Sequence, residues 1–420
     1  MSGMRVQTPV LIGHPGAAHF IYEMVAAVEA LGFDSRFETG FYYDPQGIWA
    51  RLLALVPARQ RGKIERELKR RSFDSIDARR VLVHPFPELA YVAAARLANH
   101  RPAVPKAVMA WRNRYIDSAI ANRIRRERPR LFIGHDTSAL RSFEAAKASG
   151  TLTVLNQMIG HLAVGDRILR EEAELHPDWA DSLHAGAPQA EIEQCLAEAR
   201  MADAILSPSD YVTQTLIEVG VAPERIHLQP FGVRVDRFKP PEVARDDGIF
   251  RLLYVGQISQ RKGLKYVLEA VKQIGDRSIE LVLVGGLVGE GRGLKPYEGW
   301  YRHVRNVPHH EVQGLFQSAD VFVYPSLHEG SALAIFEGMA TGLPVITTLN
   351  SGSMVRDGIE GKIVPIRSVD AIAEAILTLK NDADLRGALG RAARVRALGF
   401  TWGHYRDRLG PLLDGLLGIG

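Results

Sequence analysis

The sequence predicts an α/β protein with two doubly wound domains, each a parallel sheet covered by helices on both faces. Three observations lead to this fold class. Short apolar runs alternate with helical segments along the chain, which is typical of parallel sheets. The alternation stops at a polar, proline-containing linker, residues 239–248, and then starts again. The length of 420 residues fits two or three domains of ordinary size.

The first domain is expected to cover residues 1–238. Its strands are predicted where apolar residues cluster, and its helices where they recur every three or four positions. The expected strands are Val10–Ile12, Leu131–Ile133, Thr151–Leu155 and Ala204–Leu206. The expected helices are Phe20–Leu31, Ser138–Ser149 and Tyr211–Val219, and Ile168–Glu172 is expected to open another.

The second domain is expected to cover residues 249–400, with the same alternation of strands and helices. Its expected strands are Arg251–Val255, Glu280–Val284, Val321–Tyr324 and Val345–Thr347. Its expected helices are Gly263–Ile274, Glu311–Ser318, Ala334–Ala340 and Val369–Lys380. An apolar segment, residues 401–420, follows this domain and contains Trp402 and Tyr405.

The composition excludes several classes of protein. An apolar fraction of 46% and a charged fraction of 24% are those of a globular chain, not of a disordered, collagenous or coiled-coil one. No apolar run approaches the ~20 residues that span a bilayer, and no secretory signal is expected. The single cysteine, Cys195, excludes a disulfide framework and fits a reducing cytoplasm.

The net charge of +4 is distributed unevenly. Residues 51–130 contain 20 Lys and Arg against 7 Asp and Glu, a local balance of +13 that leaves −9 for the rest. Leucines lie beside the basic run at residues 51–71, so this segment is interpreted as a helix at an anionic membrane surface or as a groove for an acidic acceptor. A solvated amphipathic face is the alternative. No nucleic-acid-binding motif accompanies the charge, so nucleic acid is not an expected partner.

Two cations follow the first strand of the second domain. Gly256 ends this strand, and Arg261 and Lys262 precede the next helix. Ligands bind at the carboxyl ends of parallel strands, and a helix N-terminus favours anions. The loop is therefore a candidate phosphate site, although two solvated cations would give the same pattern.

Two glutamates follow the strand Val321–Tyr324. Glu329 lies in the loop after the strand, and Glu337 lies in the first turns of the next helix. A carboxylate can accept two hydroxyl hydrogen bonds, which suits a sugar or a ribose. A helix-start glutamate that only complements the helix dipole is the alternative.

Taken together, these motifs closely resemble the retaining glycosyltransferases of family 4. The resemblance runs from about residue 202 to 420 and is weaker before that. It rests on the motifs Ser207-Pro208-Ser209-Asp210, Gly232-Val233-x-Val235-Asp236, Arg261-Lys262-Gly263, Glu329-Gly330, Glu337-Gly338-Met339-Ala340 and Gly342-x-Pro344. It implies the GT-B fold, in which two Rossmann-like domains face a cleft and the last helix, here residues 401–420, crosses back to the first domain.

The resemblance implies a role for each matching position. Lys262 would bind the donor diphosphate, Glu337 the nucleotide ribose, and Glu329 would lie beside the transferred sugar. The amides of Gly330, Ser331, Ala332 and Leu333 would hold phosphate and sugar, with Gly256 leaving room for them. Gly16 would close over the donor from the opposite domain. Many relatives have Arg directly after the strand-end glycine where this chain has Gln257, so Arg261 is expected to compensate.

The first domain would supply the acceptor side and a histidine near the reacting carbon. His161 is the favoured candidate for this catalytic histidine, with His135 behind it and His14 also on the acceptor side. A packed or solvated histidine is the alternative. His328 is expected to be structural.

The expected activity is transfer of a sugar from a UDP-, GDP- or ADP-sugar to a hydroxyl acceptor, such as a cell-envelope glycan or a lipid-linked saccharide. No further cofactor and no metal is expected, because no Asp-x-Asp follows a strand. The expected location is the cytoplasm, with a peripheral position on the inner face of the membrane as an option. A GT-B epimerase, a phosphorylase and a non-catalytic nucleotide-sugar-binding subunit remain alternatives. A dinucleotide oxidoreductase is disfavoured, since the first strand lacks Gly-x-Gly-x-x-Gly.

Overall fold

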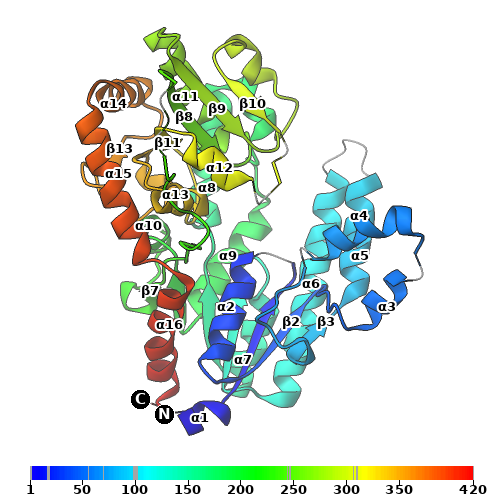
Figure 1. The fold of residues 1–420 in the computed structure, drawn as a ribbon. Helices are drawn as coiled ribbons and strands as arrows, with labels where there is room; N and C mark the ends of the chain where they lie inside the picture. The colour runs from blue at the N-terminus through cyan, green and yellow to red at the C-terminus, as the bar shows by residue number, and fades with distance from the viewer. Residues whose placement is uncertain are drawn as a thin grey trace.

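The computed structural model describes residues 2–16, 19–54, 56–69, 71–97, 103–243, 245, 247–305, 307–308 and 311–419. Within these ranges the chain forms two parallel sheets, one from each half of the sequence, with helices on both faces (Figure 1). The sequence therefore predicted the fold class correctly.

The first sheet has the strand order β3-β2-β1-β4-β5-β6-β7 in the described part of the chain. Its strands are β1 Pro9–His14, β2 Asp34–Thr39, β3 Val81–Val83, β4 Leu131–His135, β5 Leu152–Asn156, β6 Ala204–Ser207 and β7 Ile226–Leu228. Its helices are α1 Ser2–Val6, α2 His19–Ala30, α3 Ile48–Ala54, α4 Ala58–Lys69, α5 Pro85–Leu97, α6 Ala103–Glu127, α7 Leu140–Ser149, α8 Leu162–Leu175, α9 Gln189–Met201 and α10 Asp210–Glu218.

The second sheet has the order β10-β9-β8-β11-β12-β13 in the same described ranges. Its strands are β8 Phe250–Val255, β9 Ile279–Val284, β10 Arg302–Val304, β11 Val321–Tyr324, β12 Val345–Thr347 and β13 Gly361–Ile363. Its helices are α11 Leu264–Ile274, α12 Val312–Gln317, α13 Leu333–Ala340, α14 Val369–Asn381, α15 Ala383–Leu398 and α16 Trp402–Leu417.

Both strand orders reverse direction at one point, between β1 and β4 in the first sheet and between β8 and β11 in the second. Connections on the two sides of such a point leave in opposite directions, so a crevice opens at the carboxyl ends of these strands. The candidate site residues after β8 and β11 lie at this crevice.

The last helix, α16, leaves the second sheet and packs beside α2 of the first, and the two chain ends lie close together (Figure 1). Tyr405, Leu409 and Leu413 join the core of the first sheet. Arg5 forms an ion pair with Asp414 there. The expected return of the last helix is thus found.

Two local predictions were wrong. The basic segment expected as one helix at residues 51–71 is divided between α3 and α4, with Pro57 between them, because proline lacks the amide proton that a continuous helix needs. Ile168–Glu172 does not open a helix, because α8 begins at Leu162.

Candidate active site

The turn after β8 brings its two cations to the switch point of the second sheet. Gln260–Lys262 form a 3₁₀ turn, labelled η4, and Gly263 follows in the left-handed region with φ +72°. A Cβ at Gly263 would lie 2.1 Å from Pro325 O, so only glycine fits. Arg261 O also accepts a 2.9 Å hydrogen bond from Leu327 N, which joins this turn to the loop after β11.

Arg261, Lys262 and Glu329 form one ionic cluster at this junction. Arg261 Nη1 lies 3.0 Å from Glu329 Oε2 and 2.9 Å from His328 O, and Lys262 pairs with the same carboxylate. Lys262 Nζ also lies 5.2 Å from the centroid of the Tyr324 ring, a cation–π contact. The side chains that approach Glu329 thus come from two loops that the sequence places far apart.

The charge of this cluster is not balanced within it. Burial lowers the pKa of Lys262, and the neighbouring charge of Arg261 lowers it further. Burial also lowers the pKa of Arg261. By formal charge, these two largely buried basic side chains and one carboxylate leave one positive charge, which a bound anion would stabilise.

Gln257 stands at the position where the family resemblance leads one to expect an arginine. This residue is exposed, and its carbonyl accepts a 2.7 Å hydrogen bond from Tyr254 Oη. Gly256 precedes it with φ +158°, a backbone conformation that L side chains rarely adopt. Arg261 follows four residues after Gln257 in the same loop, and its compensation for the missing arginine stays a prediction.

The loop between Glu329 and α13 packs tightly against the first half of the chain. A Cβ at Gly330 would lie 1.8 Å from Met158 O, and Ser209 Oγ donates a 2.6 Å hydrogen bond to Gly330 O. Gly160 N donates to Glu329 O at 3.1 Å. The backbone around Glu329 is therefore held by both halves.

The expected cradle of four amides is only partly available. Ala332 N donates to Ser351 O at 3.3 Å, and Gly330 N lies 3.3 Å from Glu329 Oε1, so both amides already have partners. Leu333 begins α13. The buried Ser331 hydroxyl, by contrast, has no hydrogen-bond partner in the described part of the chain, so it is a candidate ligand group that sequence reasoning had assigned only through its amide.

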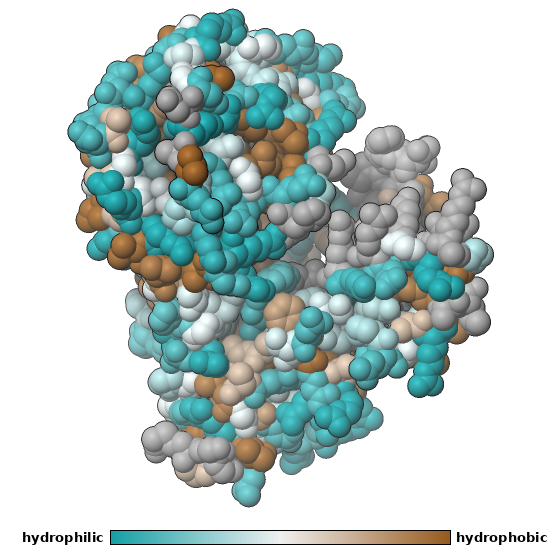
Figure 2. All heavy atoms as spheres, viewed as in Figure 1, coloured by the Kyte–Doolittle hydropathy of each residue, from teal (hydrophilic) through white to brown (hydrophobic). Residues whose placement is uncertain are grey.

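Glu337 lines a cavity of about 750 Å³ between the two halves. The first half contributes His19, Tyr22 and Phe73, and the second contributes Val307, Pro308, Val312, Leu333 and Glu337, with Arg234, Arg237 and Trp402 at the crossover. The face of the molecule is hollowed between the second domain and the lobe that carries α4 (Figure 2). Burial raises the pKa of Glu337 to about 7, and the charge of Arg237 opposes this shift. The cavity is large enough for a nucleoside.

His14 and His135 meet at the switch point of the first sheet, with ring centroids 4.8 Å apart. His14 Nδ1 lies 2.6 Å from Gly16 O and His135 Nδ1 lies 2.8 Å from Gly13 O, so each ring is fixed by backbone. Burial lowers the pKa of both imidazoles, that of His14 to about 4, so both are neutral near pH 7. The Arg112 side chain lies next to Gly16, because a Cβ at Gly16 would lie 3.6 Å from the Arg112 guanidinium.

His161 lies in a different environment from the one expected. Its Nδ1 accepts a 3.2 Å hydrogen bond from Ala163 N and caps α8, and the ring is buried. Burial lowers its pKa. Among the residues that the structure describes, no hydrogen bond or ion pair joins His161 to the Arg261–Lys262–Glu329 cluster, although the preceding residue, Gly160, donates to Glu329 O.

His328 is the imidazole that contacts both halves. Its Nδ1 lies 2.7 Å from Tyr211 Oη, and the positions of Gly160 and Gly165 abut its ring. Burial and the charge of Arg261 lower the pKa of His328 to about 4. The structural role expected for this residue is consistent with these contacts, which nothing in the local sequence reveals.

In the described ranges, no group of three or more His, Cys, Asp or Glu side chains is arranged to hold a metal ion. Across the same part of the chain, no helix combines the length and apolar character needed to cross a membrane.

Comparison with known proteins gives a family match over part of the chain and a fold for the whole of it. Residues 249–382 match the family model described as glycosyl transferases group 1. The full chain superposes on sucrose-phosphate synthase from Thermosynechococcus elongatus with a TM-score of 0.68 and 16% identity, covering 98% of this chain and 100% of that one. It superposes on HepE from Anabaena, solved in complex with UDP and glucose, with a TM-score of 0.63 and 14% identity, covering 97% and 100%. The chain has the GT-B fold.

Curated relatives match over part of their length. The putative colanic acid biosynthesis glycosyltransferase WcaL of Escherichia coli K12 is 28% identical over 47% of this chain and 52% of its own. D-inositol 3-phosphate glycosyltransferase of Corynebacterium jeikeium is 31% identical over 51% and 58%. The chain thus spans little more than half the length of these relatives.

Within this GT-B fold, the predicted site residues form two groups. Arg261, Lys262 and Glu329 come together in one cluster, and Glu337 lines the cavity on the same helix-and-loop segment. His14, His135 and Gly16 gather at the switch point of the other sheet. The residues that sequence reasoning missed are Arg112 and the aromatic lining of the cavity, since none of them belongs to a local motif. For Ser331 the sequence indicated the amide but not the unpartnered hydroxyl.

Proposed function

We propose that this protein is a retaining glycosyltransferase that moves a sugar from a nucleoside-diphosphate sugar to a hydroxyl acceptor. The observation that carries the proposal is the buried cluster of Arg261, Lys262 and Glu329 at the strand ends, with its one uncompensated positive charge. The cavity beside Glu337 supplies room for the nucleoside. The match to glycosyl transferases group 1 covers these residues and supports the assignment.

The donor diphosphate would bind Lys262 and Arg261, with Ser331 Oγ as a further hydrogen-bond donor. In the reaction, the bond between the sugar C1 and the diphosphate oxygen breaks, and a bond from the acceptor oxygen to C1 forms on the same face. The acceptor proton passes to the departing diphosphate, whose negative charge the two cations stabilise. Glu329 would accept hydrogen bonds from the sugar hydroxyls, and Glu337 from the ribose. No step in this scheme requires a metal.

A UDP-sugar is supported as donor by the solved relative in complex with UDP and glucose. GDP- and ADP-sugars use the same diphosphate contacts. On the acceptor side, His14 and His135 present neutral imidazoles at the carboxyl ends of β1 and β4. His161 stays the candidate catalytic histidine: its Nδ1 caps α8, and its Nε2 has no hydrogen-bond partner in the described part of the chain.

Turnover with a panel of nucleotide sugars tests the proposal. Release of UDP, GDP or ADP is measured with and without saccharide acceptors, and the anomeric configuration of the product is read by NMR. Lys262→Ala and Glu329→Gln should reduce transfer about a hundredfold or more, while Arg292→Ala, an exposed arginine paired with Glu290, should not. Unchanged turnover in both site variants contradicts the assignment. Epimerised nucleotide sugar, or binding without turnover, would support the alternatives instead.

For the acceptor we propose a cell-envelope glycan or a lipid-linked saccharide, reached from the inner face of the membrane. Relatives include a galactosyltransferase of Escherichia coli named for a diphosphoundecaprenol acceptor, which supports this class. The basic segment would bind the anionic surface through α6. This helix turns Ile116, Ile120 and Ile124 inward, and one outward stripe carries Trp111, Arg114, Tyr115, Asn122, Arg125 and Arg126.

The outward stripe combines the two features of an interfacial surface. Phe86 from α5 is 69% exposed and meets the Trp111 ring at 6.0 Å, and Tyr115 lies 6.0 Å further along. Amphipathic aromatic rings favour the interface, and each nearby cation adds about 1 kcal/mol of attraction to anionic lipid.

Co-sedimentation with phosphatidylcholine vesicles, with and without phosphatidylglycerol, tests this surface. The protein should bind the anionic vesicles, and binding should fall with added salt. Arg125→Glu with Arg126→Glu should abolish binding, whereas the charge-matched Arg292→Glu with Arg391→Glu on the other domain should not. Equal binding to neutral vesicles, or an equal effect of both pairs, argues against it.

A further inference from the structure

Glu172 is a fully buried carboxylate that three donors of the other domain surround. Gln260 Nε2 donates to Glu172 Oε1 at 2.6 Å, Tyr266 Oη donates to the same oxygen at 2.7 Å, and Arg367 Nε donates to Oε2 at 2.8 Å. A buried carboxylate is stable only when its lone pairs are matched in this way. Glu172 belongs to α8, which precedes the linker in sequence, whereas all three donors follow it.

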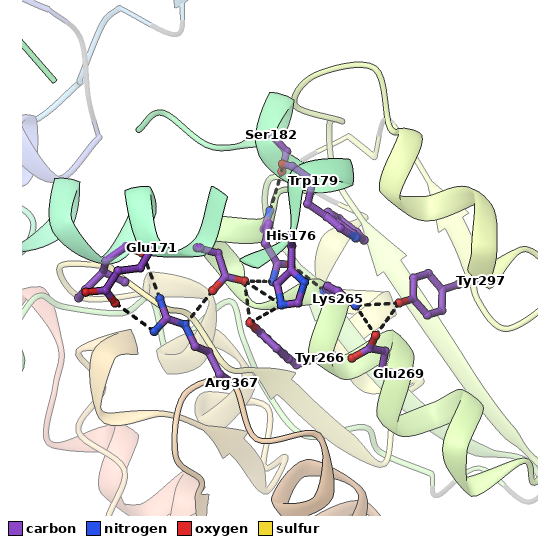
Figure 3. Close-up of polar contacts among 12 residues, drawn as sticks. Glu171, His176, Trp179, Ser182, Lys265, Tyr266, Glu269, Tyr297 and Arg367 are labelled. Atoms are coloured by element: carbon purple, nitrogen blue, oxygen red, sulfur yellow. Dashed lines mark hydrogen bonds and ion pairs between the residues drawn. The ribbon is translucent and has the colours of Figure 1, made fainter. Parts of the chain in front are cut away.

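The segment that carries Glu172 is attached to the second domain. We call residues 162–182 the bracket; it consists of α8 and the 3₁₀ turn η2, Pro177–Ser182. Trp179 of the bracket is buried in the core of the second domain. His176 Nε2 lies 3.0 Å from Tyr266 Oη, and Arg367 Nη2 donates to Ile168 O at 3.1 Å. Figure 3 shows His176 of the bracket beside Tyr266 of α11, and Arg367, which precedes α14, reaching the bracket.

Gln260 connects the bracket to the cations of the active site. Gln260 is itself buried and directly precedes Arg261 and Lys262. Its Nε2 binds Glu172, its Oε1 accepts a 2.9 Å hydrogen bond from Lys265 N, and its backbone N donates to Ser182 Oγ at 2.9 Å. Two of these three contacts go to the bracket, so the bracket sets the position of the turn that carries the cations.

We infer that Glu172 is a positioning residue that holds Arg261 and Lys262 in register for the donor diphosphate, acting through Gln260. Arg261 and Lys262 share one 3₁₀ turn, so a small displacement of this turn would move both side chains together and away from the diphosphate. This inference rests on the proposed function for its purpose. Its test uses binding of inorganic pyrophosphate, which needs neither turnover nor knowledge of the base and sugar.

Glu172→Gln replaces a charged acceptor by a neutral amide with two N–H groups of its own, so the contact with Gln260 Nε2 weakens. Pyrophosphate affinity measured by calorimetry should fall about tenfold, which corresponds to about 1.4 kcal/mol. The donor KM should rise by a similar factor, with the acceptor KM unchanged. Glu171→Gln is the matched control, because Glu171 is the adjacent residue and accepts a 3.2 Å hydrogen bond from Arg367 Nη1. The Glu171→Gln protein should bind pyrophosphate as tightly as the unmodified chain.

A double-mutant cycle separates positioning from general destabilisation. Gln260→Leu removes the Gln260–Glu172 hydrogen bond from the side of Gln260. If Glu172 acts through Gln260, the double variant should bind pyrophosphate only slightly more weakly than Glu172→Gln alone. If the two residues act independently, the fold-losses in affinity should multiply. If Glu172→Gln does not fold, Tyr266→Phe removes one of the three hydrogen bonds to Glu172 and should weaken pyrophosphate binding two- to threefold.

Two results would overturn the inference. Folded Glu172→Gln that binds pyrophosphate as tightly as the unmodified chain overturns the inference alone. Failure of the unmodified chain to bind pyrophosphate overturns the proposed function, and this inference with it.

Discussion

Arg261 Nη1 and Glu329 Oε2 are joined by a 3.0 Å ion pair, and the same carboxylate also pairs with Lys262. Without a donor, Glu329 thus occupies the two cations that we propose bind the diphosphate. Donor binding must exchange this carboxylate for phosphate oxygens, and Glu329 is then free to meet the sugar. The donor-free cluster would therefore bind a free anion such as pyrophosphate more weakly than a donor that also offers hydroxyl groups to Glu329.

Glu329→Gln should change anion binding and turnover in opposite directions. Without the competing carboxylate charge, inorganic pyrophosphate should bind about fivefold more tightly by calorimetry, while sugar transfer should nearly vanish. The control is Glu290→Gln, an exposed glutamate paired with Arg292, which should alter neither quantity. Weaker pyrophosphate binding in Glu329→Gln would contradict the exchange.

Glu337 should make donor binding depend on pH. Burial raises its pKa from an ordinary value of 4.5 to about 7, so the carboxylate that accepts ribose hydrogen bonds forms only as pH passes through about 7. Affinity for the nucleotide sugar should rise between pH 6 and 8, and Glu337→Gln should remove this rise. A titration of affinity against pH that is identical in both proteins would exclude Glu337 from the site.

The same shift affects stability with a definite sign. The folded chain binds the Glu337 proton more tightly than the unfolded chain, so Glu337 lowers stability progressively from pH 4.5 to about 7. Glu337→Gln should therefore melt at a higher temperature than the unmodified chain at pH 8. Near pH 4 the two melting temperatures should agree.

Gly330→Ala should destabilise the contact between the domains. The added methyl carbon would lie 1.8 Å from Met158 O, so the loop after β11 must shift, at a cost of about 1–3 kcal/mol. Thermal unfolding measures this cost. Gly314→Ala in α12 is the control, because nothing lies within 4 Å of its Cβ and alanine favours a helix. Equal melting temperatures for the two variants would contradict the tight packing.

His328 should make the protein sensitive to mild acid. Burial lowers its pKa from 6.5 to about 4, with the charges of Arg261 and Lys262 and the neighbouring His161 acting in the same direction. As pH falls from 6.5 to 4, the unfolded chain takes up a proton that the folded chain resists, so stability falls. His328→Gln should show a smaller loss of melting temperature over this range. The exposed His404→Gln should behave like the unmodified chain.

The second half of the chain was well predicted because its signals are local. β12 was placed at its observed bounds, and the loops after β8 and β11 contain the residues that form the ionic cluster. Residues that follow adjacent strands of a parallel sheet must meet at one edge, so a short sequence pattern suffices.

The rest depends on contacts that no short pattern encodes. β2 begins with a polar run, Asp34-Ser35-Arg36, and β3 and β7 have three residues each, too few for periodicity to identify. The sequence did not reveal that the His161 ring caps a helix, because this helix, α8, was predicted to begin at Ile168 and begins at Leu162. The attachment of Glu172 to Gln260 joins residues 88 positions apart.

The return of α16 to the first domain fixes the order in which the chain can finish folding. Tyr405, Leu409 and Leu413 complete the hydrophobic core that contains Ile12 and Val25. During synthesis these residues leave the ribosome after the whole second sheet. The first domain therefore keeps one apolar side uncovered while the second sheet folds, and we expect this side to be prone to aggregation until the last helix docks.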